Sequence, residues 1–350
     1  METFSWPDVL GPLLEGRDLS EGQAAAAMSS IMRGEATPAQ IGAFASALRC
    51  KGESVEEIVG LVRAMLEFSC EVPVAGPLLD TAGTGGDRSG TFNISTVAAI
   101  VVAGAGVRVA KHGNRAASSH CGSADLLEAL GVVIDLPGPE VAHCIEEVGI
   151  GFCFAPVFHS AMRHAAGPRR EVGVPTVFNI LGPLANPAGA AHQALGVSDP
   201  KMAKKMAAAL LRLGKAHALV YYGHDGLDEI TTTTTSTVIE VRPGQERSFE
   251  VDPAEFGLAY ARREDLLGGN ASENAEIARR VLAGQRGPAR DAVLLNAAAA
   301  LVAADKVDSL AEGLPIASTA LDSGEAARVL ERWAEVSSRL AGKNAATGDR

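Results

Sequence analysis

LLDTAGTGGDRSGTFNISTVAAIVVAGAG, residues 78–106, is the stretch that decides the fold class of this chain. Its apolar, strand-like start ends at Asp80 and Thr81, a glycine-rich loop follows, and an Ala/Val-rich helix begins at Ser95. Glycines can adopt positive φ and turn several backbone N–H groups toward one point. Since a helix N-terminus adds further N–H groups and a positive dipole end, the stretch predicts a site for a phosphate or diphosphate.

The loop matches neither of the common nucleotide-binding fingerprints. A P-loop requires Gly-Lys-Ser/Thr after its glycines, whereas Asp87-Arg88-Ser89 follow here. The Rossmann pattern G-x-G-x-x-G also fails, because Arg88 stands where the third glycine belongs. Taken alone, the loop is compatible with a glycine-rich surface turn as well as with an anion site.

The composition narrows the class of protein and of partner. The 350 residues suffice for one large or two medium domains. A net charge of -11 argues against nucleic-acid binding, which needs a basic face. Five scattered cysteines lack CxxC or zinc-ligand spacing and indicate reduced thiols. We recognise neither a signal peptide nor a membrane-spanning stretch, and we expect a cytoplasmic protein with no nucleic-acid or membrane partner.

The first 70 residues predict a group of short helices. Three capping-box patterns, Ser20-x-x-Gln23, Thr37-x-x-Gln40 and Ser54-x-x-Glu57, each precede a run with helical spacing. The second pattern also has a proline, Pro38, at the first helical position. We therefore expect an all-helical unit at the N-terminus.

From Leu78 onward, strands and helices alternate, which is typical of βαβ units and a mainly parallel sheet. The β-branched threonine run near the end of this pattern is interpreted as an exposed strand. The expected strands are 78–83, 106–114, 132–137, 218–223 and 231–241, and expected helices begin at 95, 123 and 291.

Three loops lie at the carboxyl ends of expected strands, where ligands bind in such sheets: 80–95, 111–123 and 223–229. In the second loop, Lys111 near a helix N-terminus suits a second phosphate. In the third, Asp228 and Glu229 offer the hard oxygen ligands that Mg²⁺ prefers. Each feature is also compatible with a solvated loop, and only the combination favours one site.

A basic stretch within residues 154–187 suggests a place for a carboxylate. An arginine there could hold a carboxylate through two parallel hydrogen bonds. Helix-surface charge is the alternative, and it fits Arg163 and Arg170 well. The histidines of this stretch lack HExxH spacing, so zinc is not indicated.

Several motifs in one order make the chain similar to a known family. They are GTGGD (83–87) with NIST (93–96), KHGNRAASS (111–119) with GSAD (122–125), NILGPLANP (179–187) and GLDE (226–229). As a set they resemble the anthranilate phosphoribosyltransferases of tryptophan biosynthesis, over nearly the whole chain. This family joins anthranilate to the ribose of phosphoribosyl pyrophosphate (PRPP) and releases diphosphate.

The resemblance implies an architecture of two parts. We expect a small helical domain, residues 1–70 completed by a segment near 155–185, and a larger α/β domain over residues 71–345. The fold would be of the nucleoside phosphorylase/phosphoribosyltransferase type, with a mainly parallel central sheet. The family is usually a homodimer formed through the helical domain, so a homodimer is expected here.

The resemblance also implies the site residues, matched motif by motif. Mg²⁺, at two ions per subunit, falls to Ser95, Asp228 and Glu229, and anthranilate falls to Gly83, Asn114 and Arg169. Arg169 is preferred to Arg170 from its place before REVGVPT. PRPP falls to Gly83, Gly86, Asp87, Thr91, Asn93, Ile94, Ser95, Thr96, Lys111, His112, Gly113, Asn114, Arg115, Ala116, Ala117, Ser118, Ser119 and Ser123.

The chemistry implied by this family requires no catalytic side chain. Loss of diphosphate from the ribose builds positive charge on the sugar, and positioning with electrostatic stabilisation supplies the catalysis. The attacking amine is neutral, so no strong base is needed. Two other classes remain: a pyrimidine-nucleoside phosphorylase, which needs an added C-terminal domain, and a non-catalytic nucleotide- or nucleic-acid-binding homologue, which needs a basic surface or degraded motifs.

Overall fold

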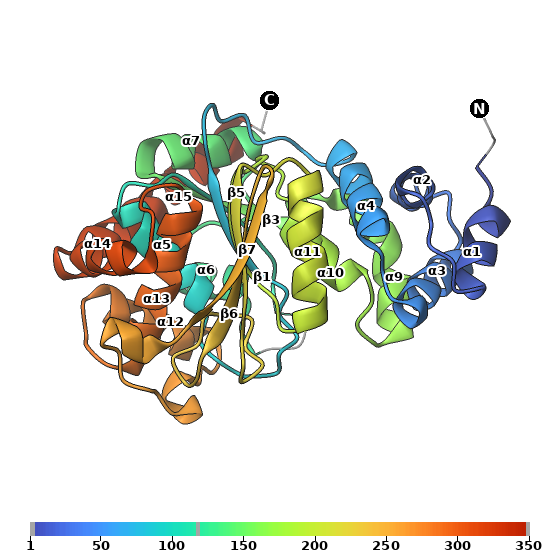
Figure 1. The fold of residues 1–350 in the computed structure, drawn as a ribbon. Helices are drawn as coiled ribbons and strands as arrows, with labels where there is room; N and C mark the ends of the chain where they lie inside the picture. The colour runs from blue at the N-terminus through green and yellow to red at the C-terminus, as the bar shows by residue number, and fades with distance from the viewer. Residues whose placement is uncertain (1–3, 117–119, 348–350) are drawn as a thin grey trace.

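The computed structural model describes residues 4–116 and 120–347, with side chains to residue 342. A small all-helical N-terminal unit stands beside a larger α/β unit with a mostly parallel sheet, which confirms the expected fold class (Figure 1). No helix in the described part of the chain is both long and apolar enough to cross a membrane.

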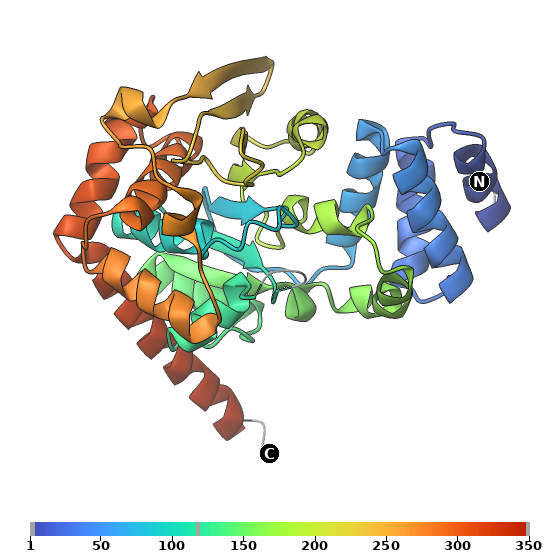
Figure 2. The same cartoon turned by 90° about the horizontal axis from the view of Figure 1, so that it is seen from below.

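The helical unit begins with α1 (Trp6–Leu14), α2 (Glu21–Met32), α3 (Pro38–Lys51) and α4 (Val55–Glu67). All three expected capping boxes are present: the side chains of Ser20, Thr37 and Ser54 each accept from the N–H three residues later. A later segment contains α8 (Ala155–Phe158), α9 (Arg163–Val172) and α10 (Phe178–Leu184). Of these, α9 packs against α2 and α3, and α10 packs against α4. Figure 2 shows α1–α4 set to one side of the α/β unit.

The sheet has seven strands in the order β3-β2-β1-β4-β5-β6-β7. The strands β1 to β5 run parallel, and β6 and β7 add two antiparallel strands at one edge. Their bounds are β1 Leu79–Gly83, β2 Val109–Gly113, β3 Ile150–Phe154, β4 His192–Gly196, β5 His217–Gly223, β6 Ser236–Arg242 and β7 Gln245–Val251.

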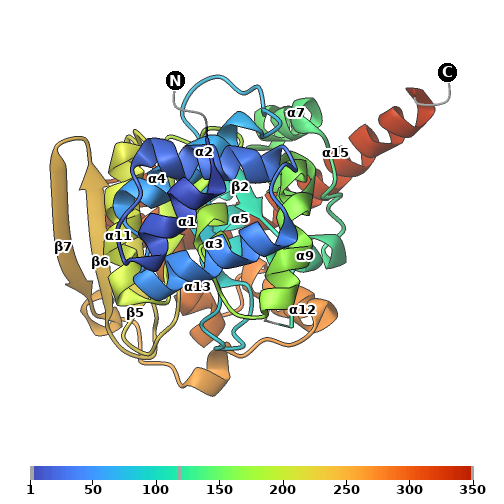
Figure 3. The same ribbon diagram turned by 90° about the vertical axis from the view of Figure 1, so that its right-hand side faces the viewer.

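Helices cover both faces of the sheet. One face carries α5 (Ile94–Gly104) and α13 (Pro288–Ala303), backed by α14 (Leu310–Asp322) and α15 (Glu325–Thr347). The other carries α11 (Pro200–Arg212), which also packs on α4 and so joins the sheet to the helical unit. The remaining helices are α6 (Ser123–Ala129), α7 (Gly138–Val148) and α12 (Ala271–Leu282). In Figure 3, the helical unit lies in front of the sheet and α15 projects away from it.

The buried residues follow this layering. Along β5, Leu219 and Tyr221 join the core beneath α5 and α13, whereas Ala218 and Val220 join the core shared by α11 and the helical unit. Successive side chains of a strand point to opposite faces, so one strand contributes to both cores.

One expected strand is wrong, and a second is correct only in its later part. Residues 132–137 form no strand, although Val132, Ile134 and Leu136 are buried, because the neighbour of β2 is the later segment β3. Of the expected strand 231–241, residues 236–241 lie in β6. Residues 231–235 precede β6, and Thr231 and Thr232 are buried in a turn instead of lying on an exposed strand. In both segments, the residue pattern reflects burial by neighbours and does not report backbone pairing.

Candidate active site

The glycine-rich loop after β1 is shaped by residues with positive φ. Gly85 and Gly86 have φ of 62° and 78°, and Arg88 reaches 53°. The N–H of Gly85 donates to Asp228 Oδ2 at 2.7 Å. A Cβ on Gly83 would lie 2.5 Å from that same oxygen, so any larger residue there would displace the Asp228 carboxylate.

Asp228 and Glu229 form an acidic pair beside the N-terminus of α5. Glu229 Oε1 accepts from the N–H of Ser95 at 3.0 Å, whereas Oε2 is buried and has no hydrogen-bond partner among the described residues. Burial raises the pKa of both carboxyls, and the neighbouring Asp87 carboxylate raises the pKa of Asp228 further. An unpartnered oxygen among crowded carboxylates fits a divalent cation.

The Lys111 side chain points into the protein and not toward solvent. Its ammonium is buried and donates to Thr81 O at 2.6 Å and Thr81 Oγ1 at 3.3 Å. Burial lowers the pKa of Lys111, and Asp80, Glu229 and Asp228 oppose that shift through their negative charge. The lysine is therefore a buried cation beneath both loops.

His112 likewise faces inward. Its Nδ1 lies 2.9 Å from Gly182 O on α10, and its backbone N–H donates to Asp80 Oδ1 at 3.0 Å. Burial lowers the pKa of His112 to about 4, so the ring is neutral at pH 7. The histidine joins β2 to α10 and leaves its other ring nitrogen without a partner in the described part of the chain.

Asp125 organises the second loop. Its Oδ2 accepts from the N–H groups of Ala116 at 3.1 Å and Gly122 at 2.9 Å, and its Oδ1 accepts from Arg115 Nη1 at 2.9 Å. Arg115 also pairs with Glu128, so its guanidinium is engaged within the protein. Asn114 is exposed beside it, and the expected residues Ala117, Ser118 and Ser119 lie outside the described residues.

Side-chain contacts join the first and second loops. Thr96 Oγ1 donates to Ser123 Oγ at 3.1 Å, and Asn93 Nδ2 donates to Cys121 O at 3.0 Å. Asn93 Oδ1 in turn accepts from Asn274 Nδ2 at 2.9 Å. Of the other expected residues, Ile94 is the buried first residue of α5, and Thr91 forms an isolated β-bridge with Leu267.

Arg169 lies on α9, at the side of the helical unit. Its guanidinium is half-buried, 5.5 Å from the Phe178 ring centroid, and it has no ion-pair partner within residues 4–116 and 120–342. Burial lowers its pKa. Phe178 begins α10, the same helix whose Gly182 meets His112. Arg170 is exposed. A half-buried guanidinium without an ion-pair partner among the described residues fits a carboxylate ligand.

Sequence reasoning missed Gly196, the last residue of β4. A Cβ there would lie 1.7 Å from the carbonyl oxygen of Asp228. The backbone carrying the acidic pair therefore passes directly over this glycine. Sequence offers only a weak signal, a glycine ending an apolar run, because the strand itself was not predicted.

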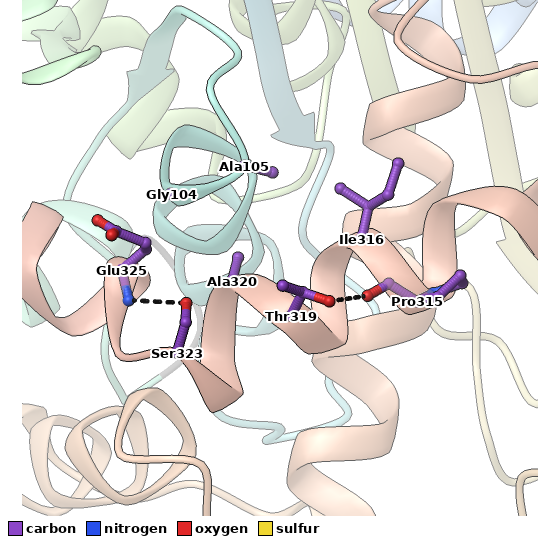
Figure 4. A pocket seen from close by; sticks show the side chains of 8 residues that line it. All are labelled: Gly104, Ala105, Pro315, Ile316, Thr319, Ala320, Ser323 and Glu325. Atoms are coloured by element: carbon purple, nitrogen blue, oxygen red, sulfur yellow. Dashed lines mark hydrogen bonds between the residues drawn. The ribbon is translucent and has the colours of Figure 1, made fainter.

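Two other features do not fit the site. His192, His217 and Asp305 meet at the opposite end of the sheet, but Arg242 Nη1 lies 2.9 Å from Asp305 Oδ1, and a cation there would be repelled. A pocket of about 360 Å³ opens between the end of α5 and α14. Its hydroxyls already bond within the protein, Thr319 to Pro315 O and Ser323 to the Glu325 N–H (Figure 4).

Comparison with known proteins agrees with this architecture. Residues 7–69 match the helical bundle domain of the glycosyl transferase family, and residues 75–327 match its a/b domain. The fold and the site thus define a glycosyltransferase.

Its relatives narrow the class. An anthranilate phosphoribosyltransferase of Nocardioides sp. is 56% identical over 96% of this chain and 99% of its own length. The Thermus thermophilus enzyme of that name has a TM-score of 0.89 and 48% identity, covering 94% of this chain and 99% of its own. The Saccharomyces cerevisiae enzyme was solved with PRPP and Mg and with 4-fluoroanthranilate. Each of these two structures is 29% identical to this chain, and their TM-scores are 0.87 and 0.85. Each match covers 95% of this chain and 98% of the yeast chain. The chain therefore belongs to the anthranilate phosphoribosyltransferase family.

Proposed function

We propose that this chain carries out its family's reaction in the loops at the carboxyl ends of the parallel strands. The 5-phosphoribosyl group of PRPP is transferred to the amino group of anthranilate, giving N-(5-phosphoribosyl)anthranilate and diphosphate. One observation carries the proposal: the carboxylates of Asp228 and Glu229 lie directly against the Gly85 N–H and the N-terminus of α5, and Glu229 Oε2 has no hydrogen-bond partner among the described residues. A cation site and an anion site side by side suit a magnesium-bound diphosphate.

The proposed residue roles follow the family's motifs. Asp228, Glu229 and Ser95 would hold Mg²⁺, at two ions per subunit, and the metal when bound would neutralise charge on the diphosphate. Gly83, Asn114 and Arg169 would hold anthranilate. The donor would be held by Gly83, Gly86, Asp87, Thr91, Asn93, Ile94, Ser95, Thr96, Lys111, His112, Gly113, Asn114, Arg115, Ala116, Ala117, Ser118, Ser119 and Ser123.

Several of these side chains already form hydrogen bonds or ion pairs within the protein. We therefore separate residues that would contact a substrate directly from residues that would act through their charge. Exposed backbone N–H groups of the first loop would contact phosphate, because Arg115 is paired with carboxylates. Lys111 would act from below as a buried positive charge. Arg169 would orient the anthranilate carboxylate, so that the neutral amine attacks the ribose without a base.

We also propose the wider organisation. Residues 1–70, completed near 155–185, would form the helical domain, and residues 71–345 the α/β domain. Two copies would pair through the helical domain. The basic test of function is Mg²⁺-dependent loss of anthranilate fluorescence when PRPP is added. Unchanged fluorescence with the purified chain, substrates and Mg²⁺ would reject the proposed activity.

Arg169→Ala is expected to raise the KM for anthranilate about 10- to 100-fold with little change in the KM for PRPP. A hydrogen bond to a charged group contributes about 1.5–3 kcal/mol, and 1.4 kcal/mol is about tenfold. Steady-state kinetics with each substrate varied in turn would measure this effect. The exposed Arg170→Ala is the matched control and should leave both constants unchanged. An effect confined to PRPP would place Arg169 in the donor site.

Gly86→Ala is expected to raise the KM for PRPP about tenfold or more. A Cβ there meets no protein atom within 4 Å, so it would extend into the open space that a phosphate must approach. The positive φ alone costs about 1–2 kcal/mol of stability. Gly257→Ala is the control, because that glycine has φ of 72°, equally open surroundings and a place outside the site. Both variants should lose similar stability. If the KM for PRPP is the same in Gly86→Ala as in Gly257→Ala, the proposed binding of phosphate by the backbone N–H groups of the first loop is rejected.

A further inference from the structure

Asn296 is a polar residue in the middle of an apolar helix. It lies in α13 between Leu295 and Ala297, and it is 2% exposed. Asparagine is a poor helix former, and a buried amide is unfavourable unless it is hydrogen-bonded. Its position in this helix is therefore explained only by the partners of its side chain.

Those partners are the backbone groups of one residue in the acidic loop. Asn296 Oδ1 accepts from the N–H of Ile230 at 3.0 Å, and Nδ2 donates to the carbonyl of Ile230 at 2.8 Å. A further bond from Nδ2 to Ala292 O, at 2.9 Å, holds the amide on its own helix. The single side chain thus clamps both polar backbone groups of Ile230.

The clamp sits next to Glu229. The N–H of Ile230 and the carbonyl of Glu229 belong to one planar peptide unit, so a bond to that N–H orients the end of residue 229. The Glu229 side chain is bound separately, at the N–H of Ser95 on α5. Two helices on the same face of the sheet therefore hold this carboxylate, α13 through the backbone and α5 through the side chain (Figure 1).

A different group holds the exposed side of the same loop. Asp225 accepts from the Leu227 N–H at 3.2 Å and from Thr231 Oγ1 at 2.8 Å. These bonds close the turn on itself but do not connect it to a helix. Asn296 is therefore the polar side chain that ties residue 230 to the helical layer.

We propose that Asn296 is a positioning residue for the magnesium site: it touches no proposed ligand atom but sets the peptide unit that directs Glu229. The inference rests on the proposed function, because it takes Glu229 as a metal ligand. Outer partners that orient a ligand commonly contribute about 10- to 100-fold to metal affinity or activity.

The test compares Asn296→Leu, of similar volume but without hydrogen-bonding groups, with the wild-type chain and with Leu301→Ala. Leu301 is fully buried on the same helix and has an apolar side chain with no hydrogen-bonding group, so its truncation is expected to lower stability without removing a bond to the acidic loop. Two readouts are used: the Mg²⁺ concentration for half-maximal transfer at saturating PRPP and anthranilate, and the shift in Tm produced by Mg²⁺ with inorganic diphosphate.

We expect Asn296→Leu to raise the half-maximal Mg²⁺ concentration about tenfold or more and to shrink the Mg²⁺-induced Tm shift. Leu301→Ala should lower Tm but keep the wild-type Mg²⁺ midpoint. A folded Asn296→Leu with the wild-type midpoint, or equal midpoint changes in both variants, would overturn the proposal. If Asn296→Leu does not fold, Asn296→Ser, which can retain one bond, is judged by the same midpoint. A wild-type chain that shows no Mg²⁺ dependence rejects the metal assignment itself, which is a separate outcome.

Discussion

Replacing Glu229 by glutamine is expected to reduce Mg²⁺-dependent transfer about 100-fold or more while making the metal-free protein more heat-stable. Loss of one strong electrostatic contact to the reacting charge typically costs about 10²–10³ in rate. The gain in stability has a different cause. The Glu229 carboxylate is buried beside Asp228 with one oxygen unpartnered, and its pKa is raised well above the usual value by burial.

The sign of the pH dependence follows from that shift. Above its unfolded pKa of about 4.5, the unfolded chain loses this proton before the folded chain does, so the folded state holds more protons and stability falls as pH rises. Because glutamine does not ionise, the Glu229→Gln variant avoids this decrease in stability as pH rises. At pH 7–8 we expect a Tm increase of about 2–4 °C, which corresponds to about 1 kcal/mol in a domain of this size. Calorimetry of metal-free protein at pH 5 and pH 8 measures it.

Glu240→Gln is the matched control for Glu229→Gln. Glu240 is also buried but pairs with Arg242 at 3.2 Å and Arg247 at 2.5 Å, and these contacts lower its pKa despite burial. Its stabilising contribution is present above the unfolded pKa and is lost as pH falls. The Glu240 variant should therefore lose stability at neutral pH. A Glu229 variant that also loses stability, or that retains wild-type Mg²⁺ dependence, would contradict the interpretation that burial with one unpartnered oxygen destabilises the ionised Glu229 side chain.

Gly196→Ala is expected to abolish measurable Mg²⁺-dependent transfer and to destabilise the protein by about 3 kcal/mol. The new Cβ would lie 1.7 Å from the Asp228 carbonyl oxygen and 2.6 Å from its carbon, so the backbone of the acidic loop must move. Overpacking of this kind costs about 1–3 kcal/mol and occasionally more. Because Asp228 and Glu229 travel with that backbone, metal binding should weaken with stability.

Chemical denaturation and the Mg²⁺ midpoint measure the two parts of that prediction. Gly22→Ala is the control, because Gly22 lies in α2 with no atom within 4 Å of the added Cβ, and alanine favours helix there. Gly22→Ala should keep full activity and the wild-type stability or more. Full activity in Gly196→Ala would show that the acidic loop does not depend on close approach to β4.

Sequence patterns predicted the parts of the fold that depend on neighbouring residues. The capping boxes at Ser20, Thr37 and Ser54 were confirmed because a cap is made within four residues. The strand–loop–helix unit of residues 78–106 was predicted for the same reason, since glycine φ values and a helix start are local. The segment 132–137 failed because strand pairing depends on a partner, and β2 pairs with a segment about 40 residues further along the chain.

The features of the site also separate into those predicted from local sequence and those that depend on tertiary contacts. The residues themselves determined that a glycine loop, a lysine and an Asp-Glu pair lie at strand ends, and their motifs indicated the family. Only the tertiary structure decided what each group does there. Lys111 donates to Thr81, Arg115 donates to Asp125, and Glu229 retains one oxygen without a partner among the described residues. The contact between Gly85 and Asp228 joins positions 143 residues apart. Burial and pairing across such separations set charge, pKa and ligand-binding capacity, and no local pattern encodes them.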